Sequence, residues 1–337
     1  MTAIVRPARA DDLDALYEMA KLAGGGFTNL PADRGALAAK LARSAEGFAR
    51  LGDACRDDLF LLMLEDLAEQ RIAGTAQIMA RVGETTPFYS YRRGTITRHS
   101  AELGRSFHAD TLTLTTDLAG SSEVGGLFLH PRYRAGGLGL LLARSRYLFI
   151  RRHRARFGDR LIAELRGVID EAGGSPFWDG LAGRFFGMGF READAFNAVN
   201  GNHVIADMMP PHPIYLAMLP DGARHVIGIP HPTGRAALRM LEEEGFASQG
   251  YLDIFDGGPT MCAATDDVRT IRDARETRVA AGEVDRGRRA LVGTGALDRF
   301  RCAFAMTEEA DGDVRVDGAA AGALQLSPGD IVLHVAR

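Results

Sequence analysis

A glycine-rich turn in the middle of the chain has the residue types and the spacing of a phosphate-binding site. A short apolar segment stops at Pro131, the following residues include Gly136, Gly137 and Gly139, and apolar residues then recur at helical spacing. Free backbone N–H groups at the start of a helix bind anions, and glycine lets a diphosphate approach the backbone closely. The turn therefore predicts a site for a phosphate-bearing cofactor where a strand is followed by a helix.

Two other kinds of phosphate loop do not fit this turn. No Gly-Lys-Ser/Thr follows the glycines, which excludes the Walker loop. The glycine spacing differs from the dinucleotide fingerprint, and no acidic residue is placed for a ribose. A surface turn that merely contains glycine is the structural alternative, but the strand before the turn and the helix after it favour the binding site.

Histidine can supply a proton near neutral pH, and three histidines of this chain precede a proline. They are His130, His212 and His231. A histidine before a proline is commonly a turn residue or a helix-end residue. The residues alone do not choose among the three.

Composition excludes several classes of protein. The 337 residues carry a net charge of −4 and are 46% hydrophobic and 25% charged, as in ordinary globular proteins. General nucleic-acid or membrane-surface binding would favour a basic excess. All cationic side chains except Lys21 and Lys40 are arginine, so the arginine cluster at 144–166 is interpreted as mostly a solvated helix face.

Cysteine usage and hydropathy bear on metal sites and location. Cys55, Cys262 and Cys302 lie far apart, which predicts neither a disulfide framework nor a metal cluster. No run of about 18 apolar residues occurs and no apolar leader opens the sequence. We therefore expect a cytoplasmic protein without a metal.

Periodicity and turn residues predict alternating strands and helices. The triple glycine at 24–26 ends the first helix and indicates close backbone approach or mobility. Residues 83–122 are predicted to be rich in loops. Short apolar runs after about 288 indicate a small β subdomain. The expected strands and helices are strands 4–7, 59–65, 71–81 and 124–129, and helices 13–20, 33–45 and 236–244.

The spacing Arg134-x-x-Gly137-x-Gly139 resembles the pyrophosphate-binding signature of the GCN5-related N-acetyltransferase superfamily. A longer series of segments, in order and spacing, is similar to the arginine N-succinyltransferase family. The similarity is strong over about residues 4–265 and weak beyond. These segments are 4–7, 24–31, 121–123 with 127–129, 164–171, 175–178 with 184–186, 210–215 and 253–260.

The resemblance implies an acyltransferase with succinyl-CoA as acyl donor and L-arginine as acceptor. It implies that Leu127 contacts succinyl-CoA and that His231 is the proton donor. For Leu127 we expect a main-chain contact, since its side chain suits core packing, and a backbone N–H there could polarise the thioester carbonyl. The residues expected to hold the cofactor's phosphates are Arg134, Gly136, Gly137 and Gly139.

An arginine acceptor presents a guanidinium, an amine and a carboxylate, so its site needs carboxylates and a cation. Glu123 and Arg166 are the first candidates. Most charged residues are solvated or paired, which is the alternative for each of them. The further candidates are Glu164, Asp170, Glu171, Arg92 and Arg93.

The expected fold class is α/β (α+β), with acetyltransferase-like mixed sheets flanked by helices. A helix followed by Gly-Phe occurs at 189–190 and again at 245–246, which leaves a tandem duplication open. We expect an acyl-CoA-binding domain at 1–200, a second, degenerate acetyltransferase-like part with the catalytic histidine at 201–285, and a small β subdomain at 286–337.

The expected reaction moves the succinyl group of succinyl-CoA to the α-amino group of L-arginine, the first step of succinyl-dependent arginine catabolism. Three alternatives stay open: a subunit of an arginine/ornithine succinyltransferase, another CoA-dependent N-acyltransferase of small amines, and a CoA-binding regulator without catalysis. We expect a homo-oligomer, or a hetero-oligomer with a related subunit, and neither nucleic-acid nor membrane partners.

Overall fold

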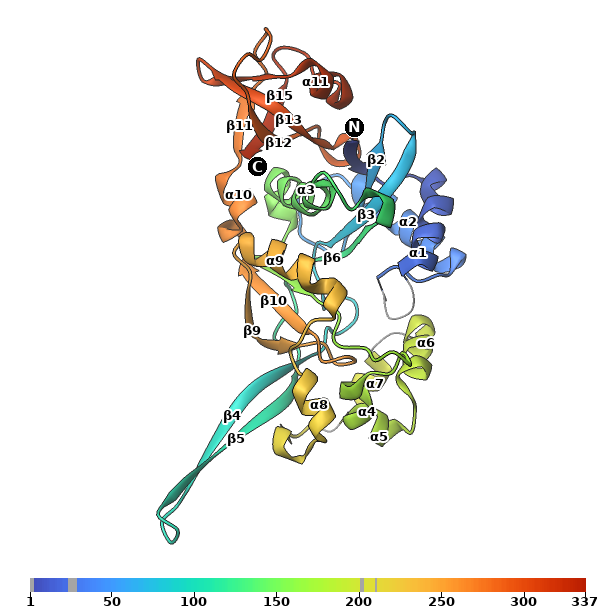
Figure 1. The fold of residues 1–337 in the computed structure, drawn as a ribbon, viewed down its shortest axis with the longest axis vertical. Helices are drawn as coiled ribbons and strands as arrows, with labels where there is room; N and C mark the ends of the chain where they lie inside the picture. The colour runs from blue at the N-terminus through green and yellow to red at the C-terminus, as the bar shows by residue number, and fades with distance from the viewer. Residues whose placement is uncertain (1–2, 24–28, 201–202, 210) are drawn as a thin grey trace.

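A computed structural model describes residues 3–23, 29–200, 203–209 and 211–337 (Figure 1). Its strands form a single sheet of fifteen, with β14 (Asp313–Val316) paired to one side of β13. The other strands follow in this order across the sheet: β11 (Arg275–Arg278), β15 (Ile331–Ala336), β12 (Arg288–Thr294), β13 (Arg301–Ala310), β1 (Ala3–Pro7), β2 (Leu59–Asp66), β3 (Arg71–Met79), β6 (Ser122–Leu129), β7 (Arg160–Glu164), β10 (Pro259–Ala264), β9 (Ala247–Leu252), β4 (Ser90–Ser100), β5 (Arg105–Thr115) and β8 (Ile214–Tyr215).

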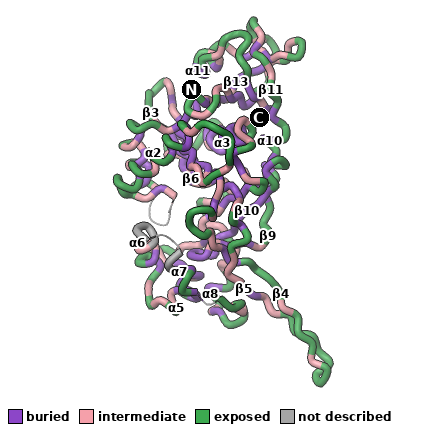
Figure 2. Tube along the Cα trace, turned by 180° about the vertical axis from the view of Figure 1, so that it is seen from behind, coloured by how far each residue is buried: buried purple, intermediate pink, exposed green. Residues whose placement is uncertain are grey.

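Helices cover both faces of the central strands. Leu141 and Leu148 of α3 pack with Leu62 of β2, whereas Leu37 of α2 packs with Leu61 on the opposite face. Successive strand residues point to opposite faces, and every residue of β2 except Glu65 is buried, so this strand is covered on both faces. Figure 2 shows the buried residues in purple through the body of the molecule. The helices are α1 (Leu13–Ala23), α2 (Arg34–Ala49), α3 (Leu138–Arg152), α4 (Pro176–Gly180), α5 (Ala182–Phe186), α6 (Phe190–Asn200), α7 (His203–Met208), α8 (Asp221–Val226), α9 (Arg235–Glu243), α10 (Arg269–Asp273) and α11 (Gly318–Leu324).

Strands β6 and β7 are paired in parallel, with α3 as the crossover between them. They pair only at Ser122–Leu161 and Glu123–Ile162, although β6 continues to Leu129. Beyond Glu123 the two strands therefore separate. This separation lies beside the start of α3, because α3 follows β6 after a short turn.

The mixed α/β fold predicted from the sequence is confirmed, and each predicted strand and helix overlaps an element of the same type. The prediction that 83–122 is rich in loops is wrong, because β4 and β5 pair from Ser90–Thr115 to Ser100–Arg105. This hairpin projects from the body (Figure 1) and is mostly exposed, so it lacks the apolar alternation of a half-buried strand. The triple glycine at 24–26 lies outside the described residues.

The three predicted domains stay a prediction. Strand β10 pairs with β7 on one side and with β9 on the other, so the sheet continues across the boundary at 200/201. On the other side of the sheet, β13 pairs with β1 and β12. Within the described chain, no helix is both long and apolar enough to cross a membrane.

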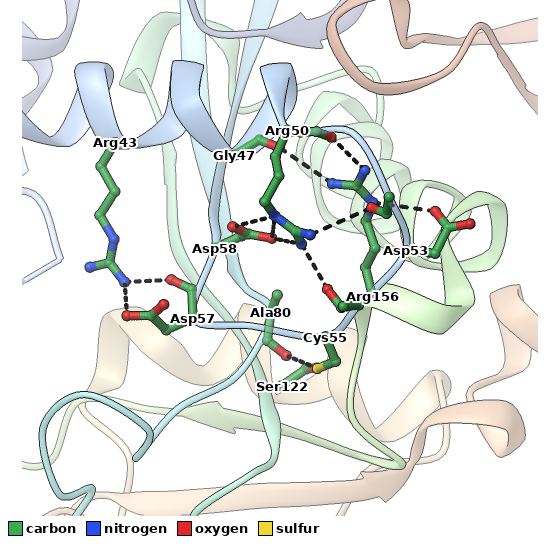
Figure 3. A network of polar contacts seen from close by, with 12 residues as sticks. Arg43, Gly47, Arg50, Asp53, Cys55, Asp57, Asp58, Ala80, Ser122 and Arg156 are labelled. Atoms are coloured by element: carbon green, nitrogen blue, oxygen red, sulfur yellow. Dashed lines mark hydrogen bonds and ion pairs between the residues drawn. The ribbon is translucent and has the colours of Figure 1, made fainter.

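The interpretation of the arginines at 144–166 as a solvated face is wrong for Arg144, Arg146 and Arg156, which are buried. Arg156, which follows α3, donates Nη2 to the carbonyl oxygen of Arg50 at 2.7 Å and Nη1 to that of Gly47 at 3.4 Å (Figure 3). Carbonyls at the end of a helix lack intrahelical partners. The buried guanidinium therefore joins the end of α2 to the segment after α3.

Arg156→Ala should lower the free energy of unfolding by about 2–4 kcal/mol, because it leaves buried carbonyls of α2 without their donor. Urea denaturation measures this loss. Arg151→Ala, at an exposed position in the last turn of α3, is the control and should change stability by less than about 0.5 kcal/mol. Equal stability of the two variants would contradict the proposed role of Arg156.

Candidate active site

A bulge in β6 lies where this strand leaves β7. The register between β3 and β6 shifts between Thr75 and Gln77, so that Ala76 faces two residues, Gly126 and Leu127. Gly126 has a φ of +55°, which glycine adopts without a Cβ penalty. A bulge takes main-chain groups out of the regular ladder. The bulge thus puts the main chain of Leu127 next to the gap between the strands.

The predicted glycine turn lies at the start of α3, as its spacing predicts. Gly136 and Gly137 have φ values of +69° and +84°, and Gly137 is the residue that caps the helix. Arg134 is exposed, and its Nε donates to the carbonyl oxygen of Leu129 at 3.4 Å, at the end of β6. The turn and the end of β6 are therefore neighbours, and the phosphate-binding role of the turn stays a prediction.

Four carboxylates gather on the face of the sheet away from α3. Glu123 is opposite Ile162, and Glu164 lies two residues beyond Ile162, so both carboxylates point to the same face. Asp253 and Asp256 come from the turn between β9 and β10. The glycines of this turn allow its approach, since a Cβ on Gly258 would lie 2.0 Å from the carbonyl oxygen of Leu165 in the segment after β7.

Burial raises the pKa of all four carboxyl groups. Burial and the charge of Asp253 raise the pKa of Glu123 to about 7, although the positive charges of Lys40 and Arg146 lower it. Burial and the charge of Asp253 raise the pKa of Asp256 to about 8. The pKa of Glu164 is raised most by burial and then by the negative charges of Asp253, Glu123 and Asp256. The mutual repulsion shows that the groups form one cluster, part of which holds protons at neutral pH.

Two cations face this cluster. Lys40 of α2 donates to the carbonyl oxygen of Asn29, and burial lowers the pKa of Lys40 to about 8 despite the charge of Glu123. Arg146 of α3 donates Nη1 to the carbonyl oxygen of Gly125 at 3.4 Å. When ionised, the four carboxylates outnumber the two cations, and a cationic ligand would stabilise that ionised form, so the site suits a cationic ligand. In the described residues no group of side chains is arranged to hold a metal ion.

Amide side chains complete this part of the site. Gln77 donates Nε2 to Oδ1 of Asn29 at 2.8 Å, whereas its own Oε1 is buried without a partner. A Cβ on Gly125 would lie 2.9 Å from Oε1 of Glu123 and 3.2 Å from Nδ2 of Asn29. Glycine therefore keeps the space between these polar groups open, and Gln77 has an acceptor left for a ligand.

The main chain brings two predicted site residues together. The backbone N–H of His231 donates to the carbonyl oxygen of Arg166 at 2.7 Å. Nδ1 of His231 lies 3.3 Å from the backbone N of Thr233 and 2.7 Å from its Oγ1. When Nδ1 accepts from both groups, the neutral ring carries its proton on Nε2. Burial and then the charge of Arg166 lower the pKa of His231, which favours the neutral ring. Nε of Arg166 is buried without a partner.

The other candidates lie elsewhere or serve local structure. Arg92 pairs with Asp117 and Arg93 with Asp110, beside the base of the β4–β5 hairpin. Asp170 accepts the backbone N–H of Gly174 at 2.8 Å within its own loop. Glu171 and His212 are exposed, and His130 accepts the backbone N–H of Arg132.

Comparison with known proteins decides the family. A family model described as "Arginine N-succinyltransferase beta subunit" matches residues 3–270, and one described as its C-terminal domain matches residues 275–336. This chain belongs to the arginine N-succinyltransferase family. Arginine N-succinyltransferases of Escherichia coli and Shigella flexneri are each 40% identical to it over 98% of this chain and 96% of theirs. The structure of arginine/ornithine succinyltransferase subunit AI from Pseudomonas aeruginosa has a TM-score of 0.89 and 33% identity, covering 99% of this chain and 98% of that one.

Several residues of the carboxylate cluster in this arginine N-succinyltransferase family member were not predicted from the sequence. Lys40, Asn29, Gln77, Asp253 and Asp256 come from separate segments, and each has an ordinary solvated or core role when considered alone. The one local signal is the pair Gly125 and Gly126, two residues after Glu123 in a strand, because a glycine inside a strand indicates a bulge or a close approach.

Glu123→Gln should weaken the dependence of stability on pH. A carboxyl group whose pKa is about 7 when folded and about 4.3 when unfolded binds more protons in the folded state. Stability is therefore fully present below the unfolded pKa and is lost as pH rises through the folded pKa. Between pH 5 and pH 8 the variant should lose about 2 kcal/mol less than the parent in urea unfolding. Glu46→Gln, on the exposed side of α2, is the control, and a slope unchanged by Glu123→Gln would contradict the assignment.

Proposed function

We propose that this chain transfers the succinyl group of succinyl-CoA to the α-amino group of L-arginine, giving N2-succinylarginine and CoA. Family membership supports acyl transfer to an amine from a CoA thioester. The observation that supports arginine as the acceptor is the cluster of carboxylates where β6 and β7 separate. A guanidinium and an ammonium group would both be stabilised there, because each relieves the repulsion among the carboxylates.

The donor site uses the two irregular backbone features. The N–H groups of the turn at Gly136 and Gly137 bind the diphosphate of CoA, and the pantetheine arm enters the gap between β6 and β7. The main-chain N–H at Leu127 in the bulge donates to the thioester oxygen. This hydrogen bond grows stronger as negative charge develops on that oxygen in the transition state, which accelerates the reaction.

The acceptor amine must lose a proton before it attacks the thioester carbon. Glu123, with a pKa of about 7, suits this general-base role at neutral pH. As the new N–C bond forms and the C–S bond breaks, the nitrogen gives up its second proton and the departing sulfur takes one up. The neutral ring of His231 donates a hydrogen bond from Nε2–H to this sulfur, and only its imidazolium form would supply the proton itself. The unpartnered Nε of Arg166 binds a substrate carboxylate, that of succinate or of arginine.

A second candidate is a subunit of an arginine/ornithine succinyltransferase. It is favoured by the 0.89 TM-score with the Pseudomonas aeruginosa subunit. Ornithine is also a cationic amino acid, so the carboxylate cluster suits both acceptors. We propose a homo-oligomer for the first candidate and a hetero-oligomer with a related subunit for the second, which mass measurements in solution distinguish.

The purified chain alone should release CoA thiol from succinyl-CoA when L-arginine is present, and should form succinylarginine, identified by mass. Succinyl-CoA should be used about 10- to 100-fold faster than acetyl-CoA, because a guanidinium paired with the distal carboxylate contributes about 1.5–3 kcal/mol. Equal rates with the two donors would defeat the donor assignment. Ornithine turnover at a similar rate would favour the second candidate, and absence of arginine turnover would refute the first.

His231→Gln should lower the turnover number about a hundredfold or more and leave the KM for succinyl-CoA almost unchanged, as expected for a group that acts in the chemical step. His212→Gln, also before a proline but exposed, is the control. If His231 serves only as a cap, the variant should melt lower but retain the parent turnover number in its folded fraction. That result would remove His231 from the mechanism.

A further inference from the structure

A second concentration of charge lies on the other side of α3, away from the carboxylate cluster. It surrounds a pocket of about 480 Å³. One part of the wall comes from α3. Other parts come from Arg289, in the segment that the second family model matches, and from Arg337, directly after that segment. The lining residues are Leu140, Arg144, Glu243, Glu244, Arg269, Arg289 and Arg337.

The pocket has more cations than its carboxylates can neutralise. Glu244 is committed to Arg144, with Nε and Oε1 3.0 Å apart. Nothing in the described chain forms a salt bridge with Arg269, Arg289 or Arg337. Arg144 is 4% exposed, and its buried Nη2 has no hydrogen-bond partner. A buried charged donor without a partner is costly, so the pocket has an unfilled place for an anion.

Two of these arginines are held close together beside the glycine turn. Arg289 and Arg337 both lie over the ring of Phe304, at 4.7 and 5.2 Å from its centre. A Cβ on Gly137 would lie 2.5 Å from Nη2 of Arg337, so this guanidinium is in contact with the turn. Burial and then the charge of Arg337 lower the pKa of Arg289. An anion between the two guanidinium groups would remove their repulsion.

We propose that Arg289 and Arg337 bind the 3′-phosphate of CoA, so that the C-terminal segment completes the acyl-CoA site. This inference rests on the proposed function, because it takes CoA as the cofactor. The backbone N–H groups of the turn bind the diphosphate, whereas Leu140 and Arg144 extend the pocket along α3 by one and two helical turns. The ligand therefore needs a second phosphate a few ångströms from its diphosphate, which CoA carries on its ribose.

The test compares CoA with dephospho-CoA, which lacks only the 3′-phosphate. Calorimetry measures the Kd of each for the parent, Arg289→Gln and Arg337→Gln, with melting temperatures as the check on folding. The parent should bind CoA at least about tenfold more tightly than dephospho-CoA, as expected for charge-assisted hydrogen bonds. In either variant this ratio should fall to about 1–3, with the Kd of dephospho-CoA unchanged. Arg288→Gln, exposed on the same strand, should retain the parent ratio.

A parent ratio near 1 would overturn the inference, as would variants that weaken both ligands equally, because equal losses indicate contact with the diphosphate instead. Each variant tests the assignment separately, so a folding defect in one leaves the other decisive. Turnover of arginine is measured in parallel. Discrimination between the two ligands without turnover would refute the proposed function alone, whereas turnover with an unchanged ratio in both variants would refute this inference alone.

Discussion

The site depends on two parallel strands, β6 and β7, that pair over only two residues. Their pairing ends at Glu123, and the bulge at Gly126 and Leu127 follows directly. A parallel pair needs a crossover, here α3, and the start of that helix must therefore lie beside the opening. In the proposed mechanism, one break in a hydrogen-bond ladder thus offers an entrance for the cofactor arm, free main-chain donors and a helix start for its phosphates.

Charges of opposite sign gather on the two sides of this opening. The face away from α3 has an excess of carboxylates around Glu123 and Glu164, whereas the pocket on the α3 side has an excess of guanidinium groups around Arg289 and Arg337. Burial raises the pKa of Glu123 to about 7 and that of Asp256 to about 8, so keeping these carboxylates charged in the folded protein costs free energy. A cationic acceptor on one side and an anionic cofactor on the other would each relieve the repulsion on its own side.

Tight backbone packing holds these charges in place. The segment after β7 lies between the turn that carries Asp253 and the segment that carries His231, and Gly167 and Gly258 allow this approach. Arg156 holds the end of α2, the helix that contributes Lys40. The proposed acceptor site is therefore assembled from separate parts of the chain, and no single element contains it.

Local features were predictable from the sequence because their causes are local. Such features depend only on neighbouring residues: glycines at a strand-to-helix turn, apolar periodicity, and a histidine before a proline. The turn at Gly137 and most central strands and helices were therefore predicted from the sequence. The choice of His231 among the histidines came from the family resemblance. Only the tertiary structure decided that Glu123 joins the cluster with Asp253 and Asp256, that Lys40 lies near Glu123, and that Arg337 lies against the glycine turn. Contacts between residues so far apart in the chain depend on strand order and register, which no local pattern specifies.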